Sequence, residues 1–129
     1  MITVTLRSYI HQHHQMPCEW SGTGKHCHDW KIDVSISAYN SGFKDGNGLP
    51  VDFGYVFVRL MEYDYRDAGQ VFSGSDEEFA SCVYADISAL IASRATTQSG
   101  NFVSKVVLFD DNNDIKIEYV PDDLPRRIS

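Results

Sequence analysis

Alternating hydrophobic and polar residues at the start of the chain predict two β-strands. Residues 2–13, ITVTLRSYIHQH, place hydrophobic side chains at nearly every second position, and residues 29–39, DWKIDVSISAY, do so again. Successive side chains of a strand point to opposite faces, so this period indicates strands with one buried face. Residues 40–50, NSGFKDGNGLP, are rich in turn-forming types and predict a surface turn region.

The hydrophobic period then changes to that of a helix. A first helix is expected over residues 53–63, with four hydrophobic residues on one side: Val56, Phe57, Leu60 and Met61. A second is expected over residues 73–95, where Ser75 and Glu78 have the spacing of a capping box. Cys82 falls inside this second helix and is expected in the core.

A β-hairpin is expected near the end of the chain. Residues 103–110, VSKVVLFD, and residues 114–120, DIKIEYV, are separated by Asp111, Asn112 and Asn113. The element order predicts an α+β fold in which two helices cover one face of a four-stranded antiparallel sheet. We expect one domain over residues 1–129, with residues 120–129 as a polar tail. The two open edges of such a sheet favour an oligomer.

Composition narrows the function classes. Hydrophobic residues make up 43% and charged residues 22% of the chain, which is typical of a globular domain. The formal net charge of −7 argues against a general nucleic-acid binder, which needs a surplus of Lys and Arg. Neither a secretory leader nor a long apolar run is evident, so we expect a cytoplasmic protein without a membrane partner.

Candidate chemistry is concentrated in residues 18–30, CEWSGTGKHCHDW. His26 and His28 stand two apart at a strand start, so their side chains are expected on one face, with Cys27 packing on the other. Two imidazoles on one face suit a metal, although they also occur on ordinary polar faces. A catalytic zinc site takes three protein ligands. His11 and His13, which share a face of the first strand, are candidates for the third.

The cysteine at the start of this stretch has two interpretations. Cys18 is either a small hydrophobic residue in a loop or a thiolate activated by nearby cations or metal. The chain has three cysteines, an odd number, so a complete disulfide framework is impossible.

Several of these motifs together resemble the 6-pyruvoyltetrahydropterin synthase and 6-carboxytetrahydropterin synthase family. The motifs are a first-strand histidine, a loop cysteine, an H-x-H-x-aromatic pattern in KHCHDWKIDV, and GLPVDF at residues 48–53. The resemblance spans about residues 7–119. It implies the tunnelling fold, in which subunits join their sheets into an oligomeric barrel, here expected as a homohexamer with sites between subunits.

The resemblance also implies a Zn²⁺ cofactor bound by three histidines. These are expected to be His26, His28 and His13, because Tyr9 precedes His13 by the interval at which the family places an aromatic residue. His11 is the reserve candidate for the first-strand position.

Further site residues follow from the same resemblance. Cys18 takes the place of the catalytic cysteine, and Asp64 with Tyr65 takes that of an Asp-His pair, so the family histidine is replaced by tyrosine. Ser75 and Glu77 align with a substrate-binding Thr-x-Glu stretch. Asp110 stands where a glutamate anchors the pterin ring.

The implied activity is that of a zinc-dependent carbon–oxygen lyase acting on 7,8-dihydroneopterin triphosphate. Its product would feed tetrahydrobiopterin or queuosine-type deazapurine biosynthesis, and the latter is favoured here. Four cations are candidate phosphate partners: Lys25, Lys44, Arg59 and Arg66. The alternative is a catalytically altered or silent zinc-binding member that serves as a pterin- or purine-binding or oligomeric interaction module.

Overall fold

The computed structural model describes residues 1–15, 25–38, 53–64, 72–94 and 101–122. Its elements, in chain order, are β1 (Ile2–Gln15), β2 (Lys25–Ala38), α1 (Phe53–Met61), β3 (Phe72–Ser73), α2 (Asp76–Arg94), β4 (Phe102–Asp110) and β5 (Ile115–Tyr119). The predicted α+β architecture is confirmed, because four antiparallel strands form a sheet on which two helices pack. Among the described residues, no helix has the length and apolar character needed to cross a membrane.

The strand order in the sheet is β3-β1-β2-β4-β5. β1 and β2 pair antiparallel along their whole length, from Ile2 opposite Ala38 to Gln15 opposite Lys25. β3 was not predicted from the sequence. It runs parallel to the end of β1, with Phe72 opposite His14. Two residues are too few to show an alternating pattern, so the sequence had no periodic signal for this strand.

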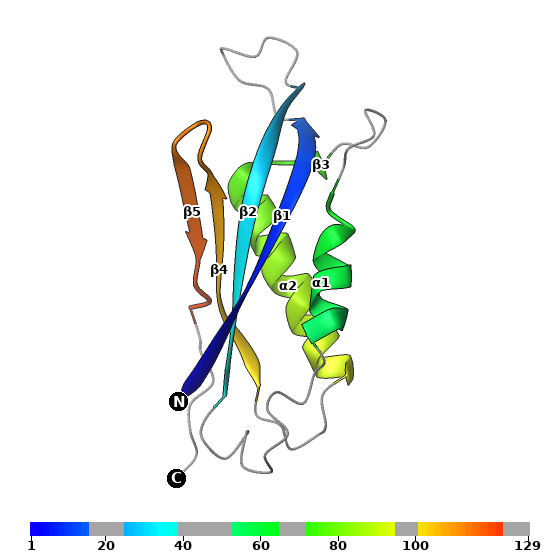
Figure 1. The fold of residues 1–129 in the computed structure, drawn as a ribbon, viewed down its shortest axis with the longest axis vertical. Coiled ribbons are helices and arrows are strands. Elements are labelled where there is room, and N and C mark those ends of the chain that lie inside the picture. The colour runs from blue at the N-terminus through cyan, green and yellow to red at the C-terminus, as the bar shows by residue number, and fades with distance from the viewer. Residues whose placement is uncertain (16–24, 39–52, 65–71, 95–100, 123–129) are drawn as a thin grey trace.

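Both helices pack on the same side of the sheet; in Figure 1, α2 lies behind β1 and β2, and α1 stands to the right of β1. α1 packs on β1, and α2 packs on β4 and β5. The core between these layers is built from side chains of β1, β2, β4 and the inner faces of the helices. Its most deeply buried members are Trp30, Ile32, Ile36, Leu60, Phe79, Ile87 and Leu108.

The start of α2 is fixed by the predicted cap. The Ser75 hydroxyl accepts the Glu78 backbone N–H at 3.1 Å, and the Ser75 carbonyl accepts the Phe79 N–H at 3.0 Å. The helix therefore begins at Asp76, three residues after the predicted start. The cap matters for the site described below, because it determines where Asp76 lies.

The two helices are joined by a polar cluster. Arg59 of α1 donates two hydrogen bonds to the Asp86 carboxylate of α2, from Nε at 2.9 Å and from Nη2 at 2.7 Å. The Tyr63 hydroxyl donates to the same carboxylate at 2.6 Å. Burial raises the pKa of Asp86, but the hydrogen bonds from Arg59 and Tyr63 outweigh burial, so the pKa lies below its usual value.

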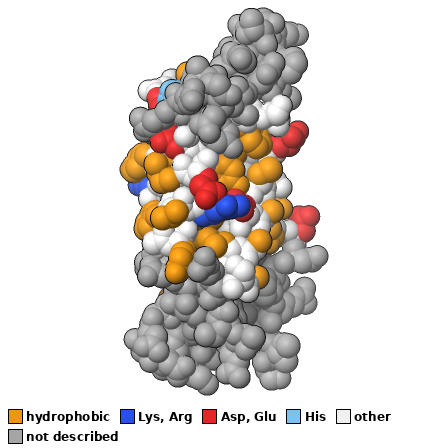
Figure 2. Space-filling view, turned by 90° about the vertical axis from the view of Figure 1, so that its right-hand side faces the viewer, with side chains coloured by type: hydrophobic (Ala, Val, Ile, Leu, Met, Phe, Trp, Pro, Cys, Tyr) orange, Lys and Arg blue, Asp and Glu red, His pale blue; other side chains and the backbone are white. Residues whose placement is uncertain are grey.

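The helix faces differ from the prediction at three residues. Val56 and Leu60 are buried, but Phe57 and Met61 are exposed, because α1 lies beside the edge strand β1 and buries only a narrow stripe. Cys82 of α2 is also exposed, so its expected place in the core was wrong. Figure 2 shows this side of the molecule, where hydrophobic side chains surround a central group of acidic and basic ones.

Candidate functional site

The polar side chains of the candidate site come together at one end of the sheet, the upper end in Figure 1. Here β1 ends, β2 and α2 begin, and β4 turns into β5. The β1–β2 register places Gln12 directly opposite His28, with both side chains buried on the face that carries the helices. Residues distant in sequence are therefore brought together by the topology.

His28 is the centre of this group. Only 3% of it is exposed, because it lies between the sheet and α2 and its ring stacks on Trp30 at a centroid distance of 4.5 Å. Its Nδ1 lies 2.5 Å from Oδ2 of Asp110, which is completely buried. A buried imidazole held this closely by a buried carboxylate has a fixed ring orientation.

Asp110 also organises the β4–β5 turn. Its Oδ1 accepts the backbone N–H groups of Asn112 at 3.1 Å and Asn113 at 3.2 Å, and its Oδ2 accepts from Asn113 Nδ2 at 2.7 Å. The turn closes at Asp114, whose φ of 56° is left-handed, a conformation that aspartate tolerates in turns. Asp110 is thus both a turn residue and the partner of His28.

Asp110 is ionised at neutral pH. Burial raises the pKa of its carboxyl, but hydrogen bonds from Asn113 and His28 outweigh burial and leave the pKa below its usual value. A carboxylate has about four acceptor sites and no donor. His28 must therefore carry a proton on Nδ1, and in the neutral imidazole the lone pair is on Nε2.

Asp76 faces that second ring nitrogen. Its Oδ1 lies 3.5 Å from His28 Nε2, and 21% of its side chain is exposed. As the first residue of α2, it reaches His28 from the helix layer, whereas Asp110 reaches it from the sheet. The imidazole is thus flanked by carboxylates on both nitrogens.

Among the residues that the structure describes, two buried donors in this region have no hydrogen-bond partner. They are Nε2 of Gln12 and Nε1 of Trp30, and each residue is only 1% exposed. Leaving a buried polar group unpaired costs about 1–3 kcal/mol, so such groups are rare and often indicate a ligand or an ion. Gln12 is opposite His28 in register and Trp30 stacks on it, so both lie next to the candidate site.

The described part of this site contains one feature that is common at zinc sites, a histidine paired with a carboxylate, but not a complete set of ligands. A metal-bound histidine commonly donates its other N–H to a carboxylate, as His28 does to Asp110. Imidazole nitrogen and carboxylate oxygen are both zinc ligands. Within the described side chains, no group of three or more His, Cys, Asp or Glu is arranged to hold a metal. The side chains of His13 and His26 lie outside that part.

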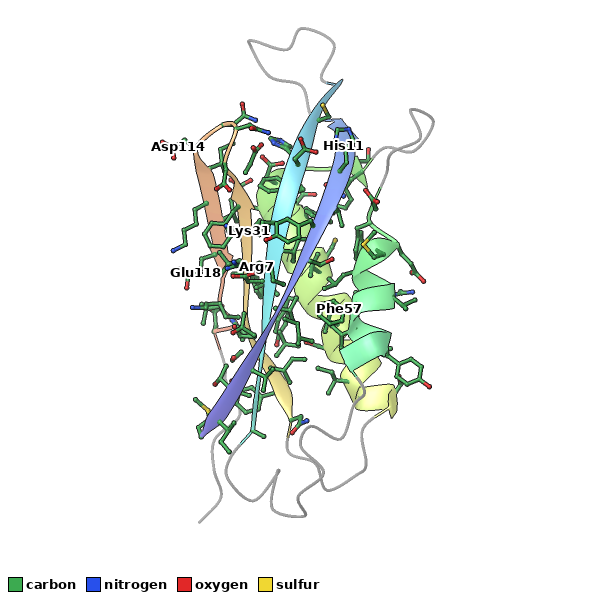
Figure 3. The ribbon with its side chains drawn as sticks, viewed as in Figure 1. Arg7, His11, Lys31, Phe57, Asp114 and Glu118 are labelled. Carbon is green, nitrogen blue, oxygen red and sulfur yellow. The ribbon has the colours of Figure 1, made fainter. Side chains whose placement is uncertain are left out.

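His11 and His28 lie on opposite faces of the sheet, so the structure does not bring this reserve ligand to His28. His11 Nδ1 lies 2.6 Å from Asp29 Oδ1 on the face without helices. Figure 3 labels His11 near the upper end of β1. In the backbone register, His13 is opposite Cys27 and His14 is opposite His26.

The predicted catalytic residues are only partly described. Cys18 and Tyr65 lie outside the described residues. Asp64 follows α1, and its Oδ1 accepts the backbone N–H of His11 at 2.8 Å, so it is held against the outer edge of β1. Cys27 faces away from His28, as expected, but it is exposed instead of packed.

Two of the three predicted substrate-binding residues make hydrogen bonds within the protein, and the third is exposed. Ser75 is used as the cap of α2, Glu77 is exposed on the first turn of that helix, and all acceptor sites of Asp110 are occupied within the protein. Of the candidate phosphate partners, Arg59 binds Asp86 and Glu62. Lys44 and Arg66 lie outside the described residues, as does the side chain of Lys25.

A hollow lies on the face of the sheet that carries no helices. It is a cavity of about 270 Å³ lined by residues that include Tyr9, Lys31, Phe109 and Asp111. Lys31 Nζ lies 4.6 Å from the centre of the Phe109 ring and 3.9 Å from Asp111 Oδ2. Figure 3 shows Lys31 on this side, so the hollow is separate from His28.

Sequence reasoning missed Gln12 and Asp76. Gln12 lies in a histidine-rich run, where a single amide attracts no notice, and Asp76 is one of three acidic residues in the first turn of α2. The start of α2 meets the end of β1 and the start of β2 at one end of the sheet. An element order that brings these ends together could have indicated that Asp76 lies near His28. The register that pairs Gln12 with His28 was not available from the sequence.

Comparison with known proteins adds no family to these observations. No protein-family model matches the chain, and no curated protein matches it either. The α+β fold and the His28 site therefore carry the functional argument.

Proposed function

We propose that the protein is a zinc-dependent carbon–oxygen lyase of the 6-carboxytetrahydropterin or 6-pyruvoyltetrahydropterin synthase type. One observation carries the proposal: His28 is buried, its Nδ1 is held 2.5 Å from the buried Asp110 carboxylate, and its Nε2 lies 3.5 Å from Asp76 Oδ1. This is the arrangement of a histidine prepared to bind a metal. The H-x-H motif of His26 and His28 and the element order support the same proposal.

The remaining ligands of the proposed zinc centre are His26 and a first-strand histidine, for which the family resemblance implies His13. In the backbone register His13 is opposite Cys27 and His14 is opposite His26, so the zinc content of His13→Ala and His14→Ala decides between the two. When bound, zinc supplies Lewis acidity, which polarises the side-chain oxygens of a dihydropterin substrate and acidifies the adjacent C–H bond. Asp110 holds the ring of His28 in place, and the unpaired N–H of Gln12 is available to an oxygen of the substrate. Cys18 is the proposed general base, since a thiolate near a dication is suited to proton transfer.

Asp64 and Tyr65 are proposed to complete proton transfer. Asp64 is fixed by the backbone of His11, so its carboxylate is held at a defined place on the edge of β1. The proposed substrate is 7,8-dihydroneopterin triphosphate, and the proposed pathway is of the queuosine type. Ser75 and Glu77 are proposed to contact that substrate at the start of α2.

The proposed assembly is a homohexamer. β1 is bordered only by the two-residue β3 near its end, so most of its outer edge has no strand partner among the described residues. Beside that edge, α1 exposes four large hydrophobic side chains: Tyr55, Phe57, Val58 and Met61. An unpaired edge and an apolar helix face support association with further copies of the chain. Light scattering after size exclusion gives the mass of the assembly.

The test of the proposed function is zinc content followed by turnover. We expect purified protein to hold one zinc per chain, and to release triphosphate from 7,8-dihydroneopterin triphosphate. Cys18→Ala is expected to keep zinc and lose turnover, whereas His28→Ala is expected to lose both. Cys82→Ala is the matched control for zinc, because Cys82 is exposed on α2 and is not a proposed ligand. Protein that neither contains zinc nor takes it up would refute the proposal.

One observation favours a second candidate, a zinc-binding member without synthase activity. The acceptor sites of Asp110 are filled by His28, Asn112 and Asn113, so a pterin ring finds no open acceptor there. Tyr65 stands where the family that the chain resembles has a histidine, and this also favours a protein without synthase activity. Protein that binds zinc and a pterin but releases no triphosphate would establish this candidate.

A further inference from the structure

We propose that the hollow on the helix-free face of the sheet binds a small aromatic anion, a single ring that carries a carboxylate or a phosphate. Lys31 is the residue assigned to the charged group, and Tyr9 is the residue assigned to the ring. The proposal does not depend on the proposed zinc centre, because His28 is buried on the opposite face of the sheet.

Aromatic and basic side chains of this face form one row across the sheet. The backbone register places Tyr9 of β1 opposite Lys31 of β2, and Lys31 opposite Phe109 of β4. It also places Phe109 opposite Lys116 of β5. Residues directly opposite each other have their Cβ atoms about 4.5–5.5 Å apart. Aromatic and basic side chains therefore alternate along the row, and its first three members line the hollow of about 270 Å³.

Lys31 is a largely buried cation whose charge is poorly matched. Only 22% of its side chain is exposed, and its Nζ lies 4.6 Å from the centre of the Phe109 ring. Its acidic neighbour is Asp111, whose Oδ2 is 3.9 Å away and whose side chain is 82% exposed. That distance is beyond the range of an N–H···O hydrogen bond, about 2.7–3.2 Å. An ammonium group has three donors, and no residue that the structure describes accepts a hydrogen bond from Lys31.

The neighbouring rows of the same face have closely matched charges. Figure 3 shows Arg7 below Lys31 and His11 above it. Arg7 donates to both carboxylate oxygens of Asp33, at 2.7 Å and 2.9 Å. His11 Nδ1 lies 2.6 Å from Oδ1 of Asp29, which also lines the hollow. The acidic groups of these rows thus have close partners of their own, and the mismatch belongs to the row of Lys31.

These features define the chemistry of the ligand. A lysine with unused donors binds a carboxylate or a phosphate through charge-assisted hydrogen bonds. Tyr9 is directly opposite Lys31 and 65% exposed, so its ring is accessible to an aromatic group beside that charge. A volume of about 270 Å³ is below that of pockets for drug-sized ligands, so it suits a single ring. The net charge of −7 opposes a nucleic acid as the ligand.

The alternative explanation is that Lys31 only covers the Phe109 ring with its aliphatic stem, as long basic side chains do at surfaces. The two explanations differ in whether an added anion binds and in the effect of Asp111. If an anion binds at Lys31, the Asp111 carboxylate competes with it, so Asp111→Asn strengthens binding. A variant that merely loses its fold cannot produce that gain.

The experiment titrates the full chain with benzoate and with phenyl phosphate, and measures binding by saturation-transfer NMR of the ligand. Benzamide, which has the shape of benzoate without its charge, is the control ligand. Lys31→Met and Tyr9→Ala remove the two assigned contacts. Lys105→Met is the matched control variant, because Lys105 belongs to another row of the same face and pairs with Glu118 at 3.4 Å. Circular dichroism checks the fold of each variant.

We expect at least one of the two anions to bind with a dissociation constant on the order of 1 mM, and benzamide to bind at least about tenfold more weakly than benzoate. Lys31→Met should lower the affinity at least about tenfold, and Tyr9→Ala should lower it about fivefold or more. Asp111→Asn should raise it roughly two- to fivefold, while Lys105→Met matches wild type.

The anion that binds more tightly identifies the charged group of the ligand. Binding of neither anion at about 10 mM would overturn the inference. Binding that folded Lys31→Met retains in full, or that Asp111→Asn does not strengthen, would overturn it as well. Zinc content is measured separately, so none of these results bears on the proposed zinc centre.

Discussion

Asp110→Asn tests whether the buried carboxylate controls the protonation of His28. The asparagine oxygen can keep the backbone N–H groups of Asn112 and Asn113, but its amide NH₂ then takes the place of Oδ2. That NH₂ cannot accept the Nδ1–H of His28. The imidazole is buried and held by stacking on Trp30, so the neutral ring must move its proton to Nε2.

Two losses follow from this change. The first is one hydrogen bond to a buried charged group, worth about 1.5–3 kcal/mol of unfolding free energy. The side chain of Asn113 is exposed and can turn to water, so its bond to Oδ2 adds little. The second loss is in zinc binding at the proposed centre, because a proton on Nε2 occupies the lone pair that this proposal assigns to the metal. We expect affinity to fall by at least the roughly 10–100-fold seen for outer-shell partners.

The assay is urea denaturation followed by circular dichroism, paired with chelator competition. Asp111→Asn is the matched control, since the Asp111 side chain is 82% exposed and surface substitutions usually change stability by less than about 0.5 kcal/mol. The denaturation slope m should stay constant, which would show that the denatured state is unchanged. If Asp110→Asn unfolds at the same urea concentration as Asp111→Asn and binds zinc equally well, the assigned role of Asp110 is wrong.

Four further predictions follow from the helices, the cap and the metal. Burial raises the pKa of Asp86, but the hydrogen bonds from Arg59 and Tyr63 lower it by more, so the pKa lies below its ordinary value of 3.8. The ionised Asp86 therefore stabilises the fold above that ordinary value, and this contribution is lost as the pH falls through the folded pKa. Urea midpoints measured from pH 6 down to pH 2 should therefore drop less steeply below about pH 4 in Asp86→Asn than in wild type; equal slopes would contradict this. Leu60→Ala should cost about 2–5 kcal/mol in urea denaturation, because it opens a cavity under α1; a loss below that range would mean that α1 does not pack as described. Ser75→Ala should cost about 0.5–2 kcal/mol by removing the cap of α2, whereas Ser75→Asp, which can also cap, should restore most of it. Saturating zinc at 100 times its dissociation constant should add about 2.7 kcal/mol of stability over chelator-treated protein, and a melting temperature unaffected by the chelator would contradict a native-state site.

The sequence predicted the elements well because their periods are long and regular. The fourteen-residue β1 and β2 alternate clearly, and α2 has both a cap and a helical apolar pattern. Two kinds of feature were not predictable. α1 lies beside the edge strand, so Phe57 and Met61 are exposed although they are apolar. β3 is two residues long and depends on tertiary pairing alone.

Of the residues at the candidate site, only His28 was predicted in its proposed role from the sequence. The H-x-H spacing identified His28, since alternation fixes which side chains share a face of a strand. Its partners come from the register of β1 on β2, the start of α2 and the end of β4, and none of these is encoded locally. Asp110 was identified for another role, as a pterin anchor, but its contacts show that it holds the turn and His28.

The long sequence separation within the site has a consequence for folding. β1 and β2 are consecutive strands and can pair early, whereas β2 and β4 pair only after the chain has closed a loop that contains both helices. His28 and Asp110 are 82 residues apart and stand on the two sides of that closure. A metal ion that requires both can bind tightly only after the sheet is complete. Zinc uptake would therefore report the last step of folding, and added zinc should slow unfolding without accelerating the earlier hairpin step.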